Sequence, residues 1–359
     1  MNGLDRIRQA VDLREPDRVP FYLPDHQFAC RFSNVTYYEH CTRADKLFES
    51  LSSTAERFGY DGTWLLGDDW IEVDVMGHQM RFFEDAPPHP IDYPVKRIED
   101  VDRIEIPDPW NDGRMPVRLK ALEMLRQRFG NRILITAHIN APWSMSCLIA
   151  GMKLAMITLR RDPSFLRSLL DLSYKNALRY AKAEIQAGAH AIWVGDDMAS
   201  SWIISPRDYT EWALPYECKL IHELKQSGAI AFIGMHEKDE QRVADQIKSG
   251  AHILSVGMKA DLERVSTSLK GRACFLGNID PDAVITQGDA EKMRSETKRC
   301  LRVAAKGGGY IFGIADVLHP DTSVEKLDQF ISIFREYCRY PLRNLDDSQN
   351  GDDVSFTAE

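Results

Sequence analysis

Long apolar runs and paired cysteines are both missing from this sequence. No apolar stretch approaches the ~18 residues that a membrane span needs, so we expect no transmembrane helix. The seven cysteines are scattered and none belongs to a C-x-x-C pair, which is typical of reduced thiols in a chain of this size. The first residues, MNGLDRIR, lack the apolar core of a signal peptide, so we expect a cytoplasmic protein.

Positive charge is also in short supply. The chain has 45 Lys and Arg residues against 54 Asp and Glu residues, a formal net charge of -9, and no basic tract. Binding to nucleic acid depends on Lys and Arg residues that replace counterions, so we expect no nucleic-acid partner. There is no G-x-S-x-G motif and no P-loop, because the glycines at 307–309 precede an apolar run and do not open a helix.

Short apolar runs separated by amphipathic stretches make up most of the 359 residues. Eight runs stand out: Val19–Leu23, Thr63–Leu66, Ile133–Ala137, Ala191–Val194, Ile230–Gly234, His252–Val256, Ala273–Leu276 and Tyr310–Ile314. Nearly all are continuous, which is typical of strands buried on both faces of a parallel sheet. Stretches such as Pro163–Gln186 before Gly188 indicate helices that end at a glycine. The pattern predicts one α/β domain over residues 1–343, a (β/α)8 TIM barrel, with a doubly wound sheet as the competing architecture.

Three segments depart from a plain barrel. Trp70–Phe83 alternates in polarity around Gly77 and His78, which predicts a β-hairpin inserted after the second strand. Residues 87–109 are rich in Pro and Asp and are predicted to wrap over the surface. Residues 344–359 are polar and acidic and are predicted to form a disordered tail.

Polar residues follow almost every predicted strand. The carboxyl ends of barrel strands meet at one mouth, so we expect these side chains to converge and to shift one another's pKa values. Asp and Asn also cap helices and turns, so each residue alone has an ordinary structural explanation. The candidates for catalysis are Asp68, Asp197, His236 and Asp316. The candidates for substrate binding are His26, Asp69, His138, Asn140, Trp143, Asp196, Trp202, Asn278 and His319.

Several short motifs together resemble the uroporphyrinogen decarboxylase superfamily, in particular its branch of corrinoid-linked methyltransferases. They are EPDRVP at 15–20, NAPWSM at 140–145, ISP at 204–206 with LPY at 214–216, GNIDP at 277–281, GGGYI at 307–311 and PDT at 320–322. The resemblance covers residues 4 to 335 and implies a (β/α)8 barrel. It also implies an enzyme that moves a methyl group between a small methylated compound, or a methyl carrier, and a corrinoid on a partner protein. Trp143 and Trp202 would then offer cation–π contacts to a cationic methyl donor.

The metal ligands of that branch are only partly present. Its methyltransferases carry H-x-C after the fifth strand and a further Cys after the eighth, and these residues hold a zinc that activates a thiol. This sequence has His236, Glu237 and Lys238 at the first motif and Asp316 at the later position. Only the histidine matches. The resemblance therefore implies either a zinc or other metal held by His236 and Asp316 without sulfur, or no metal.

The decarboxylase branch offers the alternative function. Its members carry an N-terminal arginine pair for the substrate's carboxylates, and residues 21–30 of this chain contain no arginine. Leu148 and Asp316 stand where that branch has Tyr and His, and Asp68 matches its pyrrole-binding Asp. An acidic mouth would repel an octacarboxylate porphyrinogen. Decarboxylation of a tetrapyrrole or smaller acid is therefore the second hypothesis, and a binding protein of the same fold without chemistry is the third.

Overall fold

The strands of the described chain form a nearly closed parallel barrel. The computed structural model describes residues 1–237 and 239–346, without the side chain of His236. Its eight-stranded sheet has the order β1-β10-β9-β8-β7-β6-β5-β2. The strands are β1 (Phe21–Tyr22), β2 (Gly62–Leu65), β5 (Leu134–Asn140), β6 (Ala191–Gly195), β7 (Ile230–Glu237), β8 (Ile253–Val256), β9 (Cys274–Ile279) and β10 (Tyr310–Ile314). Each overlaps one predicted run, which confirms the (β/α)8 prediction.

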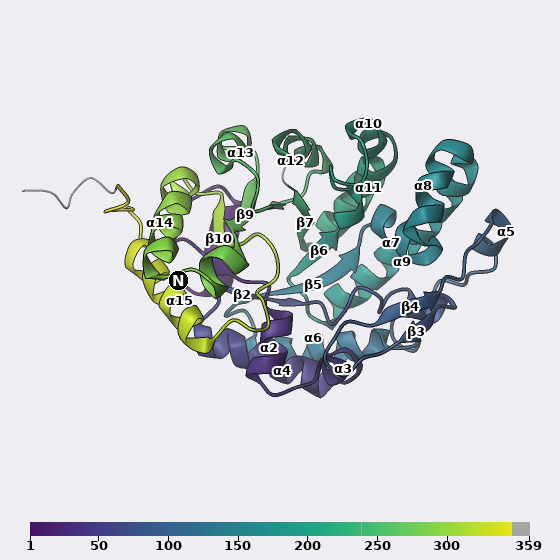
Figure 1. Ribbon diagram of the computed structural model, residues 1–359, viewed down its shortest axis with the longest axis horizontal. Coiled ribbons are helices and arrows are strands. Elements are labelled where there is room, and N and C mark those ends of the chain that lie inside the picture. The colour runs from purple at the N-terminus through teal and green to yellow at the C-terminus, as the bar shows by residue number, and fades with distance from the viewer. Residues whose placement is uncertain (238, 347–359) are drawn as a thin grey trace, which may run out of the picture.

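Helices surround the strands on all sides (Figure 1). Those before and after β1 and β2 are α1 (Gly3–Val11), α2 (His26–Phe32), α3 (Tyr37–Thr42), α4 (Ala44–Phe58), α5 (Ile98–Val101) and α6 (Met115–Phe129). After β5 and β6 come α7 (Pro142–Ala150), α8 (Met152–Arg161), α9 (Pro163–Ala187), α10 (Pro206–Asp208), a π-helical turn η3 (Tyr209–Ala213) and α11 (Leu214–Gln226). The remaining strands are followed by α12 (Glu240–Gln246), α13 (Leu262–Leu269), α14 (Ala290–Cys300) and α15 (Val324–Tyr337). Glycine ends several of these helices as predicted; Gly188 has a φ of 118° after α9.

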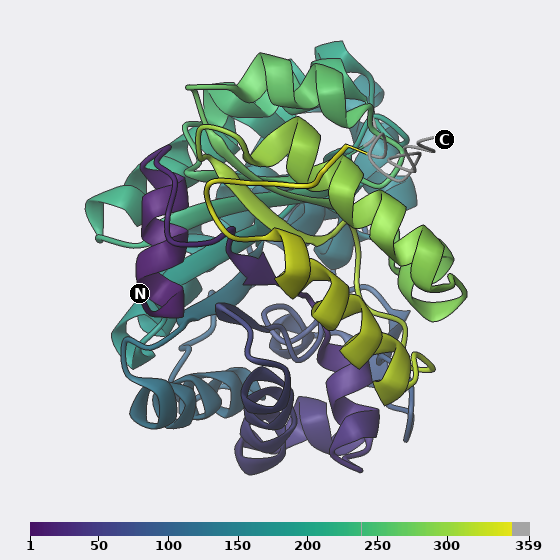
Figure 2. The same cartoon turned by 90° about the vertical axis from the view of Figure 1, so that its left-hand side faces the viewer.

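The last helix closes the barrel on the side of β1 and β10. Figure 2 shows α15 lying next to α14 across this side of the molecule. Phe334 of α15 stacks on Phe312 of β10 with ring centroids 4.6 Å apart, and on Phe21 of β1 at 5.0 Å. All three rings are buried. Since full burial of a Phe side chain is worth about 1.5–3 kcal/mol, this aromatic contact fastens the C-terminal helix to the first and last strands.

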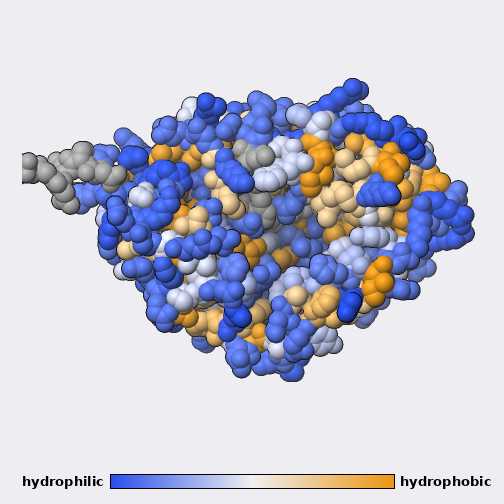
Figure 3. Space-filling model, viewed as in Figure 1, coloured by the Kyte–Doolittle hydropathy of each residue, from blue (hydrophilic) through white to orange (hydrophobic). Residues whose placement is uncertain are grey.

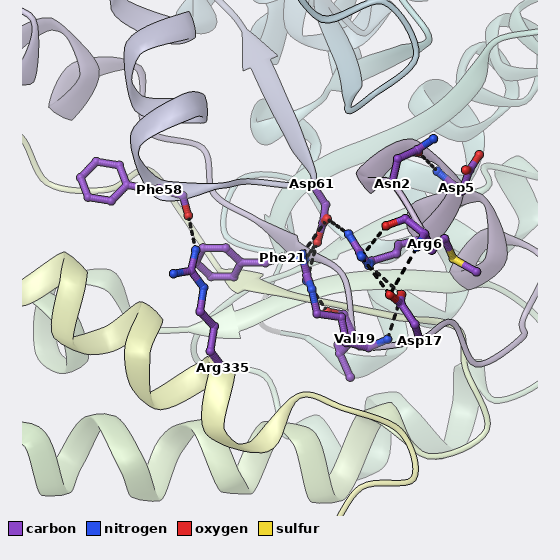
Figure 4. A network of polar contacts seen from close by, with 11 residues as sticks. Asn2, Asp5, Arg6, Asp17, Val19, Phe21, Phe58, Asp61 and Arg335 are labelled. Atoms are coloured by element: carbon purple, nitrogen blue, oxygen red, sulfur yellow. Dashed lines mark hydrogen bonds and ion pairs between the residues drawn. The ribbon is translucent and has the colours of Figure 1, made fainter.

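A buried carboxylate joins β1 to β2 at the amino ends of these strands (Figure 4). The backbone N–H of Asp61 donates to the carbonyl of Phe21 at 2.9 Å, and the N–H of Phe21 donates to the Asp61 carboxylate at 2.8 Å. Arg18 donates to both oxygens of this carboxylate at 2.7 and 2.9 Å, and Arg6 adds a contact of 3.0 Å. β1 and β2 stand at the two ends of the strand order, and the hydrogen bonds of Asp61 therefore link them where the barrel closes.

The hairpin predicted within Trp70–Phe83 is not confirmed in that form. Residues 74–76 form a 3-10 turn, and Ile71 and Val73 are fully buried in the core. The buried side chains anchor this segment against the barrel, which prevents it from forming an exposed strand. A two-stranded antiparallel pair does occur further along, between β3 (Gln79–Arg81) and β4 (His89–Asp92), so its connection spans residues 82–88 and not Gly77-His78.

Two other sequence expectations concern membranes and the tail. No single helix in the described ranges is long and apolar enough to cross a membrane. Only α7 and α8 taken together have the necessary length and composition, and this pair is bent by 110°. Every residue of α7 is buried within the protein. Of the predicted disordered tail, residues 347–359 lie outside the described residues.

Candidate active site

Polar residues from several strands gather at the carboxyl end of the barrel. Asp68 follows β2, Asn140 ends β5, Asp196 follows β6 and Asp316 follows β10. Because all eight strands are parallel, these four positions lie at the same end. In Figure 3 the face seen in Figure 1 is hollowed near its centre, inside the ring of helices. The expected convergence of strand-end residues at one mouth therefore agrees with the topology.

Two of the predicted catalytic carboxylates line one cavity in this mouth. The cavity has a volume of about 410 Å³ and is lined by Asp197, Ser200, Trp202, Ile203, Met235, Met258, Lys259, Ala315 and Asp316. Trp202 remains 57% exposed, and the Lys259 ammonium lies 5.3 Å from the centroid of its ring. The cavity combines an apolar wall with carboxylates, which is the usual make-up of a small-molecule site. The side chain of His236, the third predicted catalytic residue here, lies outside the described residues.

Lys259 is a lining residue that the sequence analysis missed. The predicted sixth strand was followed only by Gly257 and Met258, neither of which ionises. Lys259 comes one position later and its side chain reaches the cavity. Lys259 is the third residue after the predicted strand, just beyond the two residues that were considered there.

The fourth predicted catalytic residue, Asp68, is held by an arginine. Asp68 is 2% exposed. Its carboxylate accepts hydrogen bonds from both Nη groups of Arg114, the second at 3.2 Å, and from the backbone N–H of Trp70 at 2.8 Å. Burial alone would raise its pKa, but the charge and hydrogen bonds of Arg114 hold that pKa below the usual value. Arg114 also binds Asp74 at 2.7 Å. Asp68 is therefore a carboxylate in the wall of the mouth, and the positive charge of Arg114 balances its negative charge.

A histidine-rich wall lies on the side of β1, β2 and β5. The ring of Trp64 in β2 contacts His26 at 5.6 Å and His138 at 5.4 Å between centroids. Both histidines are buried, and burial lowers the pKa of His26 to about 4, so its ring is neutral at pH 7. His138 Nε2 lies 3.8 Å from the exposed carboxylate of Asp69. The structure thus brings three predicted binding residues, His26, Asp69 and His138, to one wall.

Asn140 is tied to a buried glutamate that the sequence analysis did not select. The backbone N–H and the side-chain amide of Asn140 donate to Glu72 Oε1 at 2.8 and 3.0 Å, and the same amide donates to the Asp69 carbonyl at 2.9 Å. Burial raises the pKa of Glu72 to about 7. Asn140 therefore joins the end of β5 to the segment after β2, and its amide points into this junction.

Asp196 begins the loop that forms the cavity wall, and Trp143 lies beneath this loop. Asp196 is fully buried and accepts from the N–H and hydroxyl of Ser144 at 3.0 and 2.6 Å. Trp143 is also fully buried, and its indole N–H donates to the Met198 carbonyl at 2.9 Å. Both side chains support the loop from inside, and neither lines the cavity described above.

Asn278 and His319 hold the backbone of segments near the strand ends. Asn278 is buried, and its amide donates to the carbonyls of Gly257 and Ala260 at 3.2 and 3.1 Å. His319 accepts from the N–H of Asp321 at 3.1 Å through Nδ1, as a turn-capping residue does. Neither residue is part of the cavity lining.

The donor set of this mouth does not fit a zinc held by thiolates. No cysteine lines the cavity of about 410 Å³, and both positions that carry Cys in the methyltransferase branch hold other residues. Within the described ranges, no three His, Cys, Asp or Glu side chains are grouped so that they could bind a metal ion. A metal held by His236 and Asp316 stays a prediction, because the side chain of His236 is not among the described parts of the chain.

Comparison with known proteins gives the family. The model of the uroporphyrinogen decarboxylase (URO-D) family matches residues 2–337. The chain belongs to this family. Among curated relatives, uroporphyrinogen decarboxylase from Hydrogenovibrio crunogenus is 24% identical over 353 residues, covering 92% of this chain and 96% of that protein. The enzyme of the same name from Carboxydothermus hydrogenoformans is 26% identical over 312 residues, covering 85% and 86%.

Solved structures support the same fold. A methyltransferase from Methanosarcina mazei superposes with a TM-score of 0.85 at 20% identity, covering 94% of this chain and 99% of that one. A B12-independent methionine synthase from Shewanella gives a TM-score of 0.54 at 15% identity, covering 81% and 87%. The resemblance to the URO-D family is therefore confirmed by the family model, and the solved structures confirm the fold.

Proposed function

We propose that this protein is a methyltransferase that moves a methyl group between a small methylated compound, or a methyl carrier, and a corrinoid on a partner protein. The observation that carries the proposal is the cavity lined by Asp197, Trp202 and Asp316. Its volume of about 410 Å³ suits a small methyl donor. Its two carboxylates favour a cationic or neutral donor over a polyanion.

The residues of the cavity have two tasks in such a reaction. Trp202, Met235 and Met258 would bind the apolar part of the donor and exclude water from it. The heteroatom that loses the methyl group keeps the bonding electrons and needs a proton, which an acidic group within reach can donate. Asp197 and Asp316 line the cavity and are the candidates for this step, with His236. A reduced corrinoid, when bound, supplies the nucleophile that accepts the methyl group.

Asp68 is not a suitable proton donor for this reaction. Arg114 holds its pKa below the usual value, and the ion pair already engages both oxygens of the carboxylate. The same ion pair weakens the decarboxylase alternative. A pyrrole-binding Asp must turn its oxygens to the substrate, whereas both oxygens of Asp68 accept hydrogen bonds from Arg114.

The test is methyl transfer to cob(I)alamin. The purified protein is mixed with cob(I)alamin and, separately, with methylated amines, aryl methyl ethers and a methylated folate, and methylcobalamin is followed by absorbance. We expect product with at least one donor and a loss of about tenfold or more in Asp316→Asn, the range for removing an acid–base group. Asp328→Asn, an exposed carboxylate outside the mouth, is the matched control. Failure of every donor would overturn the proposal.

Decarboxylation is the second candidate, favoured by the names of the curated relatives. Its test is the chromatographic loss of carboxyl groups from uroporphyrinogen. If this occurs and Asp68→Asn abolishes it, the methyltransferase proposal is replaced. If no porphyrinogen is consumed while methylcobalamin forms, the decarboxylase reading is excluded.

A further inference from the structure

The segment of residues 196–204, hereafter the β6 loop, carries Asp197, Trp202 and Ile203 to the cavity. We infer that Arg242 on α12 is the positioning residue of this loop and thereby sets the shape of the cavity wall. The inference goes beyond the proposed function and does not rest on it, because it concerns where the loop lies and not what reaction follows.

Arg242 donates hydrogen bonds to the β6 loop at two points. Its side chain is 2% exposed, although it belongs to a short helix on the outside of the barrel. One Nη group donates to the Ala199 carbonyl and the other donates to the Ile204 carbonyl at 3.1 Å. The two carbonyls stand on either side of Trp202. A planar guanidinium can hold both at once, which a single ammonium cannot do with the same geometry.

Further contacts fix the loop backbone between and before these two carbonyls. Glu237, at the end of β7, accepts from the N–H and the hydroxyl of Ser201 at 2.7 and 2.5 Å. The Met198 carbonyl accepts from Trp143, and its N–H donates to the Ser144 hydroxyl at 3.2 Å. The backbone is thus held from α7, β7 and α12, while the Trp202 ring projects outward with 57% of its surface exposed.

A buried chain of polar groups connects Arg242 to the first residue of the loop. The guanidinium lies 4.3 Å from the centroid of the Tyr209 ring, and the Tyr209 hydroxyl donates to Glu217 at 2.6 Å. Glu217 in turn interacts with Asp196. Burial raises the pKa of both carboxyl groups; the charge of Asp196 raises the pKa of Glu217 further, whereas the hydrogen bond with Glu217 lowers that of Asp196. Both ends of the β6 loop are therefore supported by one network.

The neighbouring wall of the mouth, at β2 and β5, contains a matched arrangement. Arg118 on α6 is fully buried and donates to the carbonyls of Asp68 at 2.9 Å and His138 at 2.5 Å. Its guanidinium lies 5.4 Å from the centroid of the Tyr180 ring, and Glu184 lies 3.3 Å away. Arg118 thus serves the ends of β2 and β5 as Arg242 serves the β6 loop. It provides a control that has the same burial and the same chemistry.

The test compares Arg242→Met with Arg118→Met by hydrogen exchange of the intact protein. We expect amide exchange in residues 196–204 to rise about tenfold or more in Arg242→Met while exchange in residues 68–72 stays unchanged. Arg118→Met should show the reverse. Equal exchange in the two segments in both variants would reduce Arg242 to a general stabilising residue and overturn the inference.

A fluorescence measurement gives a second readout at the cavity wall itself. The chain has seven tryptophans, so the contribution of Trp202 is taken as the difference between each protein and its Trp202→Phe counterpart. We expect that difference to be more strongly quenched by acrylamide in Arg242→Met than in the parent, and unchanged in Arg118→Met. No change in Arg242→Met would contradict the inference.

Arg242→Lys keeps the test informative if the Met variant does not fold. Lysine can reach one carbonyl but does not span both, so we expect loop exchange between that of the parent and that of a fully released loop. Exchange identical to the parent would show that the paired contact is dispensable. None of these readouts depends on methyl transfer, so they succeed or fail separately from the proposed function.

Discussion

Gly195, the last residue of β6, lies directly against the imidazole ring of His138 in the neighbouring strand β5. A Cβ added at Gly195 would lie 2.7 Å from Cε1 and 3.2 Å from Nε2 of that ring. The absence of a side chain at Gly195 is therefore what allows His138 to occupy the histidine-rich wall of the mouth.

The first prediction follows from this contact. Gly195→Ala should lower the free energy of unfolding by about 1–3 kcal/mol, the usual cost of overpacking, because the ring must shift within a buried site. Urea denaturation measures the change. In a His138→Ala background the same substitution should be nearly neutral, with a coupling above about 0.5 kcal/mol. Equal losses in both backgrounds would show that the backbone, and not the ring, opposes the methyl group.

A second prediction concerns the carboxylate that closes the barrel at the amino ends of the strands. Asp61 is 2% exposed and pairs with Arg18 and Arg6, so Asp61→Asn removes the carboxylate partner of the part-buried Arg18, whereas Arg6 keeps its ion pair with Asp17. We expect a loss of about 1.5–3 kcal/mol in the free energy of unfolding, the range for hydrogen bonds to charged groups.

The control for Asp61 is an exposed ion pair of similar length. Asp328 binds Arg57 at 2.6 Å with side chains that are 43% and 47% exposed. Asp328→Asn should cost below about 1 kcal/mol, because water screens the pair. A comparable loss in both variants would show that burial does not strengthen the Asp61 contacts.

The third prediction is a pH dependence that originates at Glu72. Burial raises its folded-state pKa to about 7, above the value of an unfolded chain. Between pH 4.5 and 7 the folded state then binds a proton that the unfolded state has lost, so this group's contribution to stability falls as the pH rises. The slope for one such group is about 1.4 kcal/mol per pH unit.

Glu72→Gln removes that contribution and keeps an oxygen that can accept from Asn140. The difference in unfolding free energy, variant minus parent, should therefore rise from pH 5 to 7 and then level off, as measured by urea titrations at four pH values. Glu123→Gln, an exposed residue paired with Lys120 at 2.8 Å, should show a difference within about 0.5 kcal/mol throughout. A flat difference for Glu72→Gln would mean that the carboxyl group is ionised when buried.

The strands were the most predictable part of the fold, for a simple physical reason. Each is a continuous apolar run because both of its faces are buried, and the residues of β2, β5 and β6 are all buried in the structure. The segment after β2 could not be predicted in the same way. Its alternating pattern indicates a half-exposed strand, whereas Ile71, Glu72 and Val73 are all buried by contacts with distant elements such as Asn140.

The candidate site was predictable in position but less so in detail. Parallel topology alone brings the strand-end residues to one mouth. Whether a side chain points into the cavity depends on partners far along the chain: Trp143 binds the carbonyl of Met198, and Asp68 binds Arg114. Arg118 and Arg242 were missed because a charged residue within an amphipathic helix usually faces water, and only the folded structure shows that they are buried.

The last prediction addresses Asp68 itself. Arg114 lowers the pKa of this carboxyl group, so the ion pair stabilises the fold above the unfolded-state pKa and is lost only as the pH falls below about 4. Asp68→Asn should therefore reduce the free energy of unfolding by about 2–3 kcal/mol, since Arg114 keeps only Asp74 as a charged partner. The loss should be constant from pH 5 to 8. Asp92→Asn, which breaks the exposed pair with Lys96, should leave the free energy of unfolding almost unchanged in the same titrations, because water screens that pair. A loss for Asp68→Asn that shrinks between pH 8 and 5 would instead show a carboxyl group that gains a proton in this range, and would restore Asp68 as a proton donor in the mouth.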